Sequence, residues 1–167
     1  MAIIRVDMAE QKTNAMRILD QLKIPYGTIY YEVEGEFTNG ADVAHKTGVP
    51  EDKNFKTLVA QGKSERYSVF VLPVSHEMDM KKAARAVGEK SIDLIPVKDI
   101  NRITGYVRGG CSPLGIKRQC RIVIHESAKD IDTIYVSGGK LGCTIYLDPF
   151  DLARAAKADF ADIVLGS

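Results

Sequence analysis

The chain has 167 residues, of which 45% are hydrophobic and 27% are charged. This is the composition of an ordinary globular protein and excludes a disordered or fibrous chain. The length is sufficient to bury one sizeable core. Its formal net charge of +1 excludes a global electrostatic attraction to nucleic acid or to an acidic membrane surface. A nucleic-acid partner would need a local basic patch, and six basic residues against one acid lie between positions 98 and 121.

The three cysteines, Cys111, Cys120 and Cys143, are odd in number and lack the spacing of a metal site or a disulfide framework. They indicate free thiols in a reducing compartment. The sequence shows no N-terminal apolar run with a cleavage site and no apolar segment of membrane-spanning length. We therefore expect a cytoplasmic protein that does not associate with a membrane.

Hydrophobic periodicity predicts about six strands and four or five helices in mixed order. Helices are expected over residues 9–22, 41–47, 80–87, 97–103 and 150–158. Strands are expected over 26–33, 55–60, 66–74, 120–125, 133–137 and 144–147, with 160–165 either a strand or a tail. Residues 67–72 are apolar enough for the centre of a sheet. Because strands and helices do not alternate strictly, we expect one α+β domain over residues 1–167.

A glycine-rich stretch from Gly105 to Arg118 holds four glycines, three cations and no acid. Glycine allows a ligand or another chain to approach the backbone closely. The stretch predicts a shaped loop, and the cations Arg108, Lys117 and Arg118 indicate an anion nearby. The alternative is a solvated loop whose charges are incidental, because such a motif alone is weak.

Several kinds of site are not supported by the sequence. There is no Gly-x-Gly-x-x-Gly and no Gly-Lys-Ser/Thr phosphate loop, and the histidines are far apart without cysteine partners, so no cofactor and no metal are predicted. Ser137 and Lys140 match Ser-x-x-Lys, but the two glycines between them are poor helix material. A turn whose amides bind an oxyanion or phosphate fits this segment better.

Lys56 lies within a predicted strand and shares one face with the apolar Leu58. This arrangement indicates a partly enclosed ammonium, which can stabilise an oxyanion or act as a base if its pKa falls. The alternative is a lysine on an edge strand that reaches into solvent.

Three segments together resemble the YbaK/EbsC family of aminoacyl-tRNA deacylases. They are Phe55-Lys56-Thr57-Leu58, the run Gly105 to Gly110 followed by Ser112-Pro113-Leu114-Gly115, and Ile134 to Lys140. Their order and spacing resemble that family from about residue 9 to residue 164.

The resemblance implies a compact α+β fold with a mixed, strongly curved, barrel-like central sheet, shared with the editing domain of bacterial prolyl-tRNA synthetases. It also implies hydrolysis of mischarged aminoacyl-tRNA, typically Cys-tRNA(Pro) and also Cys-tRNA(Cys), with tRNA(Pro) and prolyl-tRNA synthetase as partners. The family's central functional lysine corresponds to Lys56. The positions that match its substrate pocket are Tyr31 (with Tyr30 the alternative), Thr57, Gly109, Gly110, Ser137, Gly138 and Thr144.

The sequence departs from the family at two places. The family commonly has Gly-Gly-Lys-Arg-Gly-Leu where this chain has Leu141 in place of the arginine and Cys143 in place of the leucine. This change puts one RNA-phosphate contact in doubt. Thr144 stands where a branch of the family has an acid, so the amino-acid preference is open.

Hydrolysis of an ester needs a nucleophile and a group that stabilises the oxyanion. No Ser-His-Asp or Cys-His set is visible. We expect the Lys56 ammonium, the Ser137 hydroxyl, and amides near Gly109-Gly110 and Gly138-Gly139 to position the substrate. Water or a substrate group, such as a ribose hydroxyl or a cysteine thiol, would then attack. We interpret Cys111 as pocket lining.

The RNA backbone would be bound by cations near the pocket, each of which makes binding sensitive to salt. The candidates are Arg108, Lys117, Arg118 and Lys140, and each could instead be an ordinary surface cation. Two other functions stay open: a tRNA- or nucleotide-binding module without turnover, and an envelope protein, against which the lack of an export signal counts. A deacylase with another preference, such as Ala-tRNA(Pro), is a further alternative.

Overall fold

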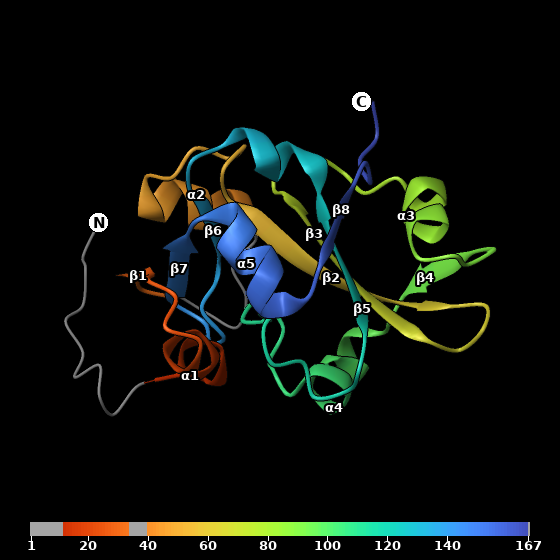
Figure 1. The fold of residues 1–167 in the computed structure, drawn as a ribbon, viewed down its shortest axis with the longest axis horizontal. Helices are drawn as coiled ribbons and strands as arrows, with labels where there is room; N and C mark the ends of the chain where they lie inside the picture. Colours follow the sequence, from red (N-terminus) through yellow and green to blue (C-terminus); the bar gives the residue numbers. More distant parts are fainter. Residues whose placement is uncertain (1–11, 34–39, 167) are drawn as a thin grey trace.

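Residues 12–33 and 40–166, the part described by the computed structural model, form five α-helices, eight strands and two 3₁₀ segments (Figure 1). In chain order these are α1 (Asn14–Gln21), β1 (Gly27–Tyr30), α2 (Gly40–Thr47), β2 (Phe55–Gly62), β3 (Tyr67–Pro73), α3 (Met80–Ala86), β4 (Ile92–Leu94), η1 (Val97–Asp99), α4 (Ile100–Thr104), β5 (Arg121–His125), η2 (Glu126–Asp130), β6 (Ile134–Ser137), β7 (Cys143–Leu147), α5 (Pro149–Ala156) and β8 (Asp159–Ala161). Among these residues no helix is long and apolar enough to cross a membrane.

The predicted helices and the six longer strands are confirmed, with their ends shifted by a few residues. Residues 9–11 of the first predicted helix lie outside the described part. The region 97–103 is a 3₁₀ turn followed by the short helix α4, rather than one continuous helix. The strand β4 within 91–95 and the strand β8 at 159–161 have three residues each, which is too short to give a periodic pattern.

The strands form two sheets, whereas the family resemblance implies one central sheet. A mixed five-stranded sheet has the order β4-β2-β3-β5-β8, and an antiparallel three-stranded sheet has the order β1-β7-β6. In the larger sheet β3 pairs antiparallel with β2 and parallel with β5. A parallel bridge between Asn54 and Tyr135 connects the two sheets. A period-two hydrophobic pattern indicates which residues share a face of a strand, but it does not indicate which strands pair. The division of the strands into two sheets therefore cannot be predicted from this pattern. Barrel-like curvature stays a prediction.

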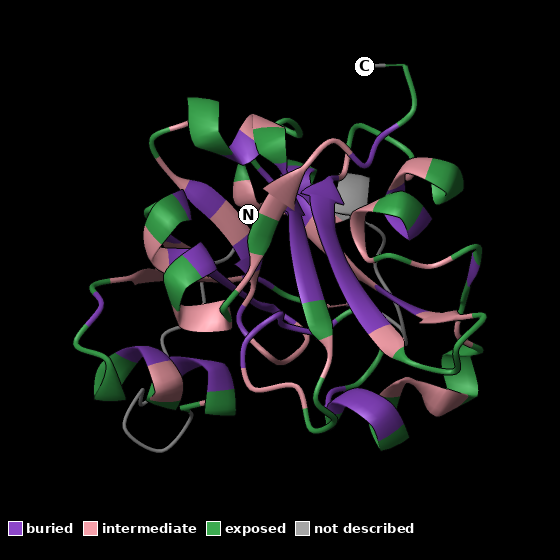
Figure 2. Ribbon diagram, turned by 45° about the vertical axis from the view of Figure 1, so that its right-hand side comes forward, coloured by how far each residue is buried: buried purple, intermediate pink, exposed green. Residues whose placement is uncertain are grey.

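The larger sheet is buried on both faces, as Figure 2 shows for the strands that run through its middle. Successive residues of β3 point into two different cores. Val69 and Val71 join a large cluster with α1, α5 and the smaller sheet, while Phe70 and Leu72 join a second cluster with α3. The prediction that residues 67–72 lie centrally is therefore confirmed.

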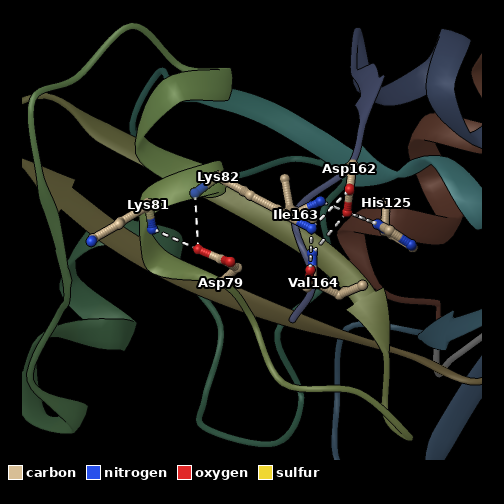
Figure 3. A network of polar contacts seen from close by, with 7 residues as sticks. All are labelled: Asp79, Lys81, Lys82, His125, Asp162, Ile163 and Val164. Atoms are coloured by element: carbon tan, nitrogen blue, oxygen red, sulfur yellow. Dashed lines mark hydrogen bonds and ion pairs between the residues drawn. The ribbon is translucent and has the colours of Figure 1, made fainter. Parts of the chain in front are cut away.

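Polar contacts fix the helix starts and the end of the chain. Asp148 caps α5 by accepting from the N–H groups of Phe150 and Asp151, as its position before Pro149 predicts. Asp162 directly follows β8, and its Oδ2 lies 2.9 Å from Nζ of Lys82 in α3. In the same network the N–H of Ile163 donates to His125 Nδ1 over 3.2 Å (Figure 3). These bonds hold residues 162 and 163 against α3 and β5.

Candidate active site

A cavity of about 430 Å³ opens between the start of β2, the segment from β4 to α4, the glycine loop and the smaller sheet. Its size suits a small-molecule ligand or the end of a larger one. One wall is apolar and includes Leu94, Val97 and Ile100, while polar side chains gather on the opposite strands. The predicted site residues that line the cavity are Tyr31, Lys56, Thr57, Arg108, Gly109, Ser137 and Thr144.

Lys56 projects from β2 into this cavity and is half-buried. Burial lowers the pKa of its ammonium, and the charge of Glu77 opposes that shift. Among the described residues, no hydrogen bond or ion pair holds its Nζ atom. The predicted partial enclosure is confirmed. A cation that is partly desolvated and unpaired is ready to interact with an anionic or polar ligand.

Strand pairing brings three of the polar residues into one row. The parallel bridge between Asn54 and Tyr135 aligns β2 with β6, and two residues further along both strands Lys56 comes level with Ser137. Ser137 is in turn the direct partner of Thr144 on β7. Segments far apart in the chain thus bring Lys56, Ser137 and Thr144 to the lining of one cavity.

Tyr31 lies just after β1 and its side chain contacts Thr144. Its N–H donates to Gly142 O over 2.9 Å, and its side chain is buried at 6% exposure. Burial raises the pKa of Tyr31, while a side-chain hydrogen bond with Thr144 opposes the rise. Tyr31 rather than Tyr30 lines the cavity, because Tyr30 packs against the large core.

The glycine loop is tightly shaped where it meets the cavity. Gly110 N–H donates to Val107 O over 2.9 Å, and Gly109 has a φ of +81° at the third position of this turn, as a type II turn requires. Further along, the Tyr106 hydroxyl donates to Leu114 O. The loop therefore presents Arg108 and Gly109 to the cavity in a defined conformation.

The expectation that amides of both glycine pairs are available to an oxyanion needs correction. Gly138 N–H already donates to Cys143 O over 2.9 Å and Gly110 N–H to Val107 O, while Gly139 N–H donates to Ser137 Oγ over 3.2 Å. The Gly109 N–H makes no hydrogen bond within the described part of the chain. It is the amide of the four that remains for a ligand.

Two of these glycines are instead required for close packing. A Cβ at Gly138 would lie 2.5 Å from Cys143 Sγ, and one at Gly110 would lie 3.0 Å from the backbone of Lys140 and Leu141. Neither residue lines the cavity. They bring the glycine loop and the turn after β6 together.

Cys111 lines the cavity and is buried, which confirms its interpretation as pocket lining. Burial raises the pKa of its thiol to about 12. A thiol with this pKa is protonated at neutral pH, and the thiolate is the nucleophilic form. Cys111 is therefore not an activated nucleophile.

The predicted RNA-binding cations differ in their relation to the cavity. Arg108 lines it, whereas Lys117, Arg118 and Lys140 do not. The Arg118 guanidinium lies 5.7 Å from the centre of the Tyr67 ring, and Lys140 Nζ lies 5.7 Å from that of Tyr30. Lys117 and Arg118 are exposed on the surface beyond the loop.

Sequence reasoning missed Asn54 and the apolar wall. Asn54 is 4% exposed and lines the cavity one position before β2. Its position two residues before Lys56, on the same strand face, is a signal that could have found it. Leu94 and Val97 lie in segments that the hydrophobic pattern predicts to be structured. That pattern does not indicate that these two residues line a site. In the described residues no cluster of three His, Cys, Asp or Glu side chains could hold a metal.

The sequence and fold of this chain are similar to those of known proteins. A model of the aminoacyl-tRNA editing domain matches residues 36–155. EbsC of Enterococcus faecalis, whose name gives it as a candidate Cys-tRNA(Pro)/Cys-tRNA(Cys) deacylase, is 38% identical over 154 residues, 92% of this chain and 94% of that protein. A proline–tRNA ligase of Brachyspira hyodysenteriae is 27% identical over 89 residues, 53% of this chain and 15% of the ligase.

A crystal structure described as a candidate trans-editing enzyme for prolyl-tRNA synthetase is similar in fold. Its TM-score is 0.75 at 20% identity, covering 93% of this chain and 99% of its own. That likeness concerns the fold alone, whereas the similarity to EbsC extends along nearly the whole sequence. Since the editing-domain model also spans most of the chain, the resemblance is confirmed and this chain belongs to the aminoacyl-tRNA editing domain family of YbaK/EbsC type.

Proposed function

We propose that this protein is a trans-acting deacylase that hydrolyses mischarged aminoacyl-tRNA, with Cys-tRNA(Pro) as its main substrate. The observation that carries this proposal is the half-buried ammonium of Lys56, which has no hydrogen-bond or ion-pair partner among the described residues and lies level with Ser137 in an otherwise largely apolar cavity. The name of EbsC supports the cysteinyl preference.

In the proposed reaction the cavity holds the terminal adenosine and its aminoacyl ester. Water attacks the carbonyl carbon, and the electron pair of the C=O bond moves to the oxygen, where Lys56 Nζ and the Gly109 N–H stabilise the negative charge. Collapse of this intermediate breaks the ester C–O bond. The ribose oxygen leaves and takes up a proton, and the free amino acid is released. A substrate group could assist the attack, because the cavity offers no activated protein nucleophile.

The cavity lining also bears on the aminoacyl group. Among the described lining residues there is no Asp or Glu, and Thr144 is engaged with Tyr31. An α-ammonium group therefore meets no carboxylate partner there, and selection depends on size and apolar contact. Cysteinyl and alanyl groups both meet those conditions, so Ala-tRNA(Pro) is the second substrate to test.

The partners and setting of the reaction follow from this proposal. Arg108, Lys117, Arg118 and Lys140 would bind the phosphates of tRNA(Pro), and prolyl-tRNA synthetase would be the enzyme that supplies the mischarged tRNA. We further propose that residues 1–167 act as one domain, in the cytoplasm where charged tRNA is found.

The test is deacylation of purified cysteinyl-, alanyl- and prolyl-tRNA(Pro) by the wild-type protein and by Lys56→Ala. We expect cysteinyl-tRNA to be cleaved fastest and Lys56→Ala to be inactive. Retention of wild-type rates by Lys56→Ala would refute the role of the lysine. Binding of tRNA without cleavage of any of the three would favour a module that holds tRNA without turnover.

A further inference from the structure

Two polar atoms in the cavity wall have no hydrogen-bond partner in the described part of the chain. They are Nδ2 of Asn54 and Oγ1 of Thr57. A buried N–H or O–H group without an acceptor costs free energy, and such groups are few in folded proteins. Both residues line the same cavity, which indicates that a ligand supplies a missing partner.

The amide of Asn54 has no function in the local fold. Its backbone is fully bonded, since its N–H donates to Pro50 O over 3.2 Å and its carbonyl accepts from Val74 N over 2.8 Å. The bridge to Tyr135 fixes the same residue between the two sheets. The backbone of Asn54 is thus fixed, and its side chain is buried at 4% exposure with Nδ2 unbonded among the described residues.

The position of Asn54 relative to Lys56 suggests what the amide binds. Residues two apart on an extended strand project from the same face, with Cα atoms about 6.6 Å apart. Asn54 and Lys56 therefore project from the same face of the strand, and both residues line the cavity. A neutral donor beside a cation suits an oxygen that carries partial negative charge in the substrate and more in the transition state.

We propose that Asn54 donates a hydrogen bond from Nδ2 to the carbonyl oxygen of the scissile aminoacyl ester, beside Lys56. This inference rests on the proposed function, because that function defines the ester. The bond strengthens as the carbonyl becomes an oxyanion, so Asn54 acts on kcat more than on KM.

The main experiment replaces the amide without changing its size. Asn54→Leu should lower kcat for cysteinyl-tRNA about 100-fold, with KM changed less than about threefold and with no loss of thermal stability, because an unpaired polar group is removed. Asn54→Asp keeps the shape but replaces the donor with an acceptor, so it should lose at least as much. Wild-type kcat in either variant would overturn the proposal.

Ser127 offers a matched control. Its Oγ is also buried and unpartnered among the described residues, but it lies in η2, outside the cavity lining. Ser127→Ala should therefore leave kcat unchanged. If Asn54→Leu lost activity together with a large fall in melting temperature, and Asn54→Asp folded normally with full activity, the role of Asn54 would be structural and the proposal wrong.

A non-hydrolysable probe separates this contact from the overall function. The probe is adenosine with cysteine joined to its 3′ position through an amide, measured by calorimetry. Asn54→Leu should bind it about twofold to threefold more weakly than the wild type, in line with the small change expected in KM. If the wild type binds the probe through Asn54 but cleaves no aminoacyl-tRNA, the proposed hydrolysis is wrong and the Asn54 contact is supported. If the wild type cleaves aminoacyl-tRNA and Asn54→Leu equals it in both assays, the Asn54 contact is wrong and the hydrolysis is supported. If the wild type neither binds the probe nor cleaves aminoacyl-tRNA, both proposals are wrong.

Discussion

Replacing Lys56 by methionine separates the chemical use of its charge from the cost of burying it. Methionine keeps a similar unbranched stem but lacks the ammonium. Because that ammonium is half-buried without a described partner and its pKa is lowered by burial, its charge destabilises the native state near neutral pH. We therefore expect Lys56→Met to be more stable than the wild type at pH 7, and inactive.

The expected magnitudes follow from these contacts. Loss of an electrostatic group at a developing oxyanion typically lowers kcat about 100- to 1,000-fold. The stability gain should be about 1 kcal/mol, in the range seen when a functional residue is replaced by one that suits its site. For a chain of this length that gain corresponds to about 2–4 °C in Tm.

The pH dependence of this stability difference gives a sharper test. In the folded state the pKa of Lys56 lies below its ordinary value of 10.5. At pH values between the folded-state pKa and 10.5, the unfolded state therefore binds more protons than the folded state. The wild type should therefore gain stability relative to Lys56→Met as pH rises through this window, and the difference should close. Urea unfolding of both proteins at pH 7 and pH 9.5 measures it. A variant less stable than the wild type at pH 7, or a difference that widens with pH, would refute the reasoning.

Three further changes have defined outcomes. Gly109→Ala should lose about 1 kcal/mol of stability, because alanine disfavours the positive φ of that turn. The same variant should have a lower kcat/KM. Thermal unfolding measures the first effect and deacylation the second. Cys111→Ala should keep kcat within about twofold, whereas loss of a true nucleophile typically costs about 10⁶-fold. Burial lowers the pKa of His125, and its Nδ1 accepts from Ile163, so stability should fall below about pH 6.5 by up to about 1.4 kcal/mol per pH unit. His125→Asn should reduce that slope in urea unfolding, and an unchanged slope would assign it to other groups.

The sequence allowed the prediction of those features that depend on local pattern. The apolar run in β3, the cap at Asp148 and the partial enclosure of Lys56 all follow from spacing along one element. Strand partners do not, since β2 can meet β6 only because both sheets form around a common core. For this reason the adjacency of Lys56 and Ser137 was available from the family resemblance but not from periodicity.

The amides of the glycine pairs show a second limit. Glycines indicate that a backbone turns or packs closely, but they do not indicate which N–H groups are already bonded. Gly138 and Gly139 donate to Cys143 and Ser137, so their amides serve the turn itself. A hydrogen-bond acceptor elsewhere in the fold decides whether a glycine amide can bind a ligand, and the glycine motif contains no information about that acceptor.

Polar groups that have no partner among the described residues lower the stability of the fold, and they mark a place where a ligand can bind. Lys56, Asn54 Nδ2 and Thr57 Oγ1 lie within four consecutive positions and all line the cavity, although each could have been an apolar residue in a strand that packs against two cores. Sequences tend to violate local rules at functional sites. Because the cost falls on one short segment at the start of β2, we infer that this segment, rather than the more conspicuous glycine loop, contributes most to stabilising the transition state. Glycine-loop variants should then affect the cavity mainly by altering its shape.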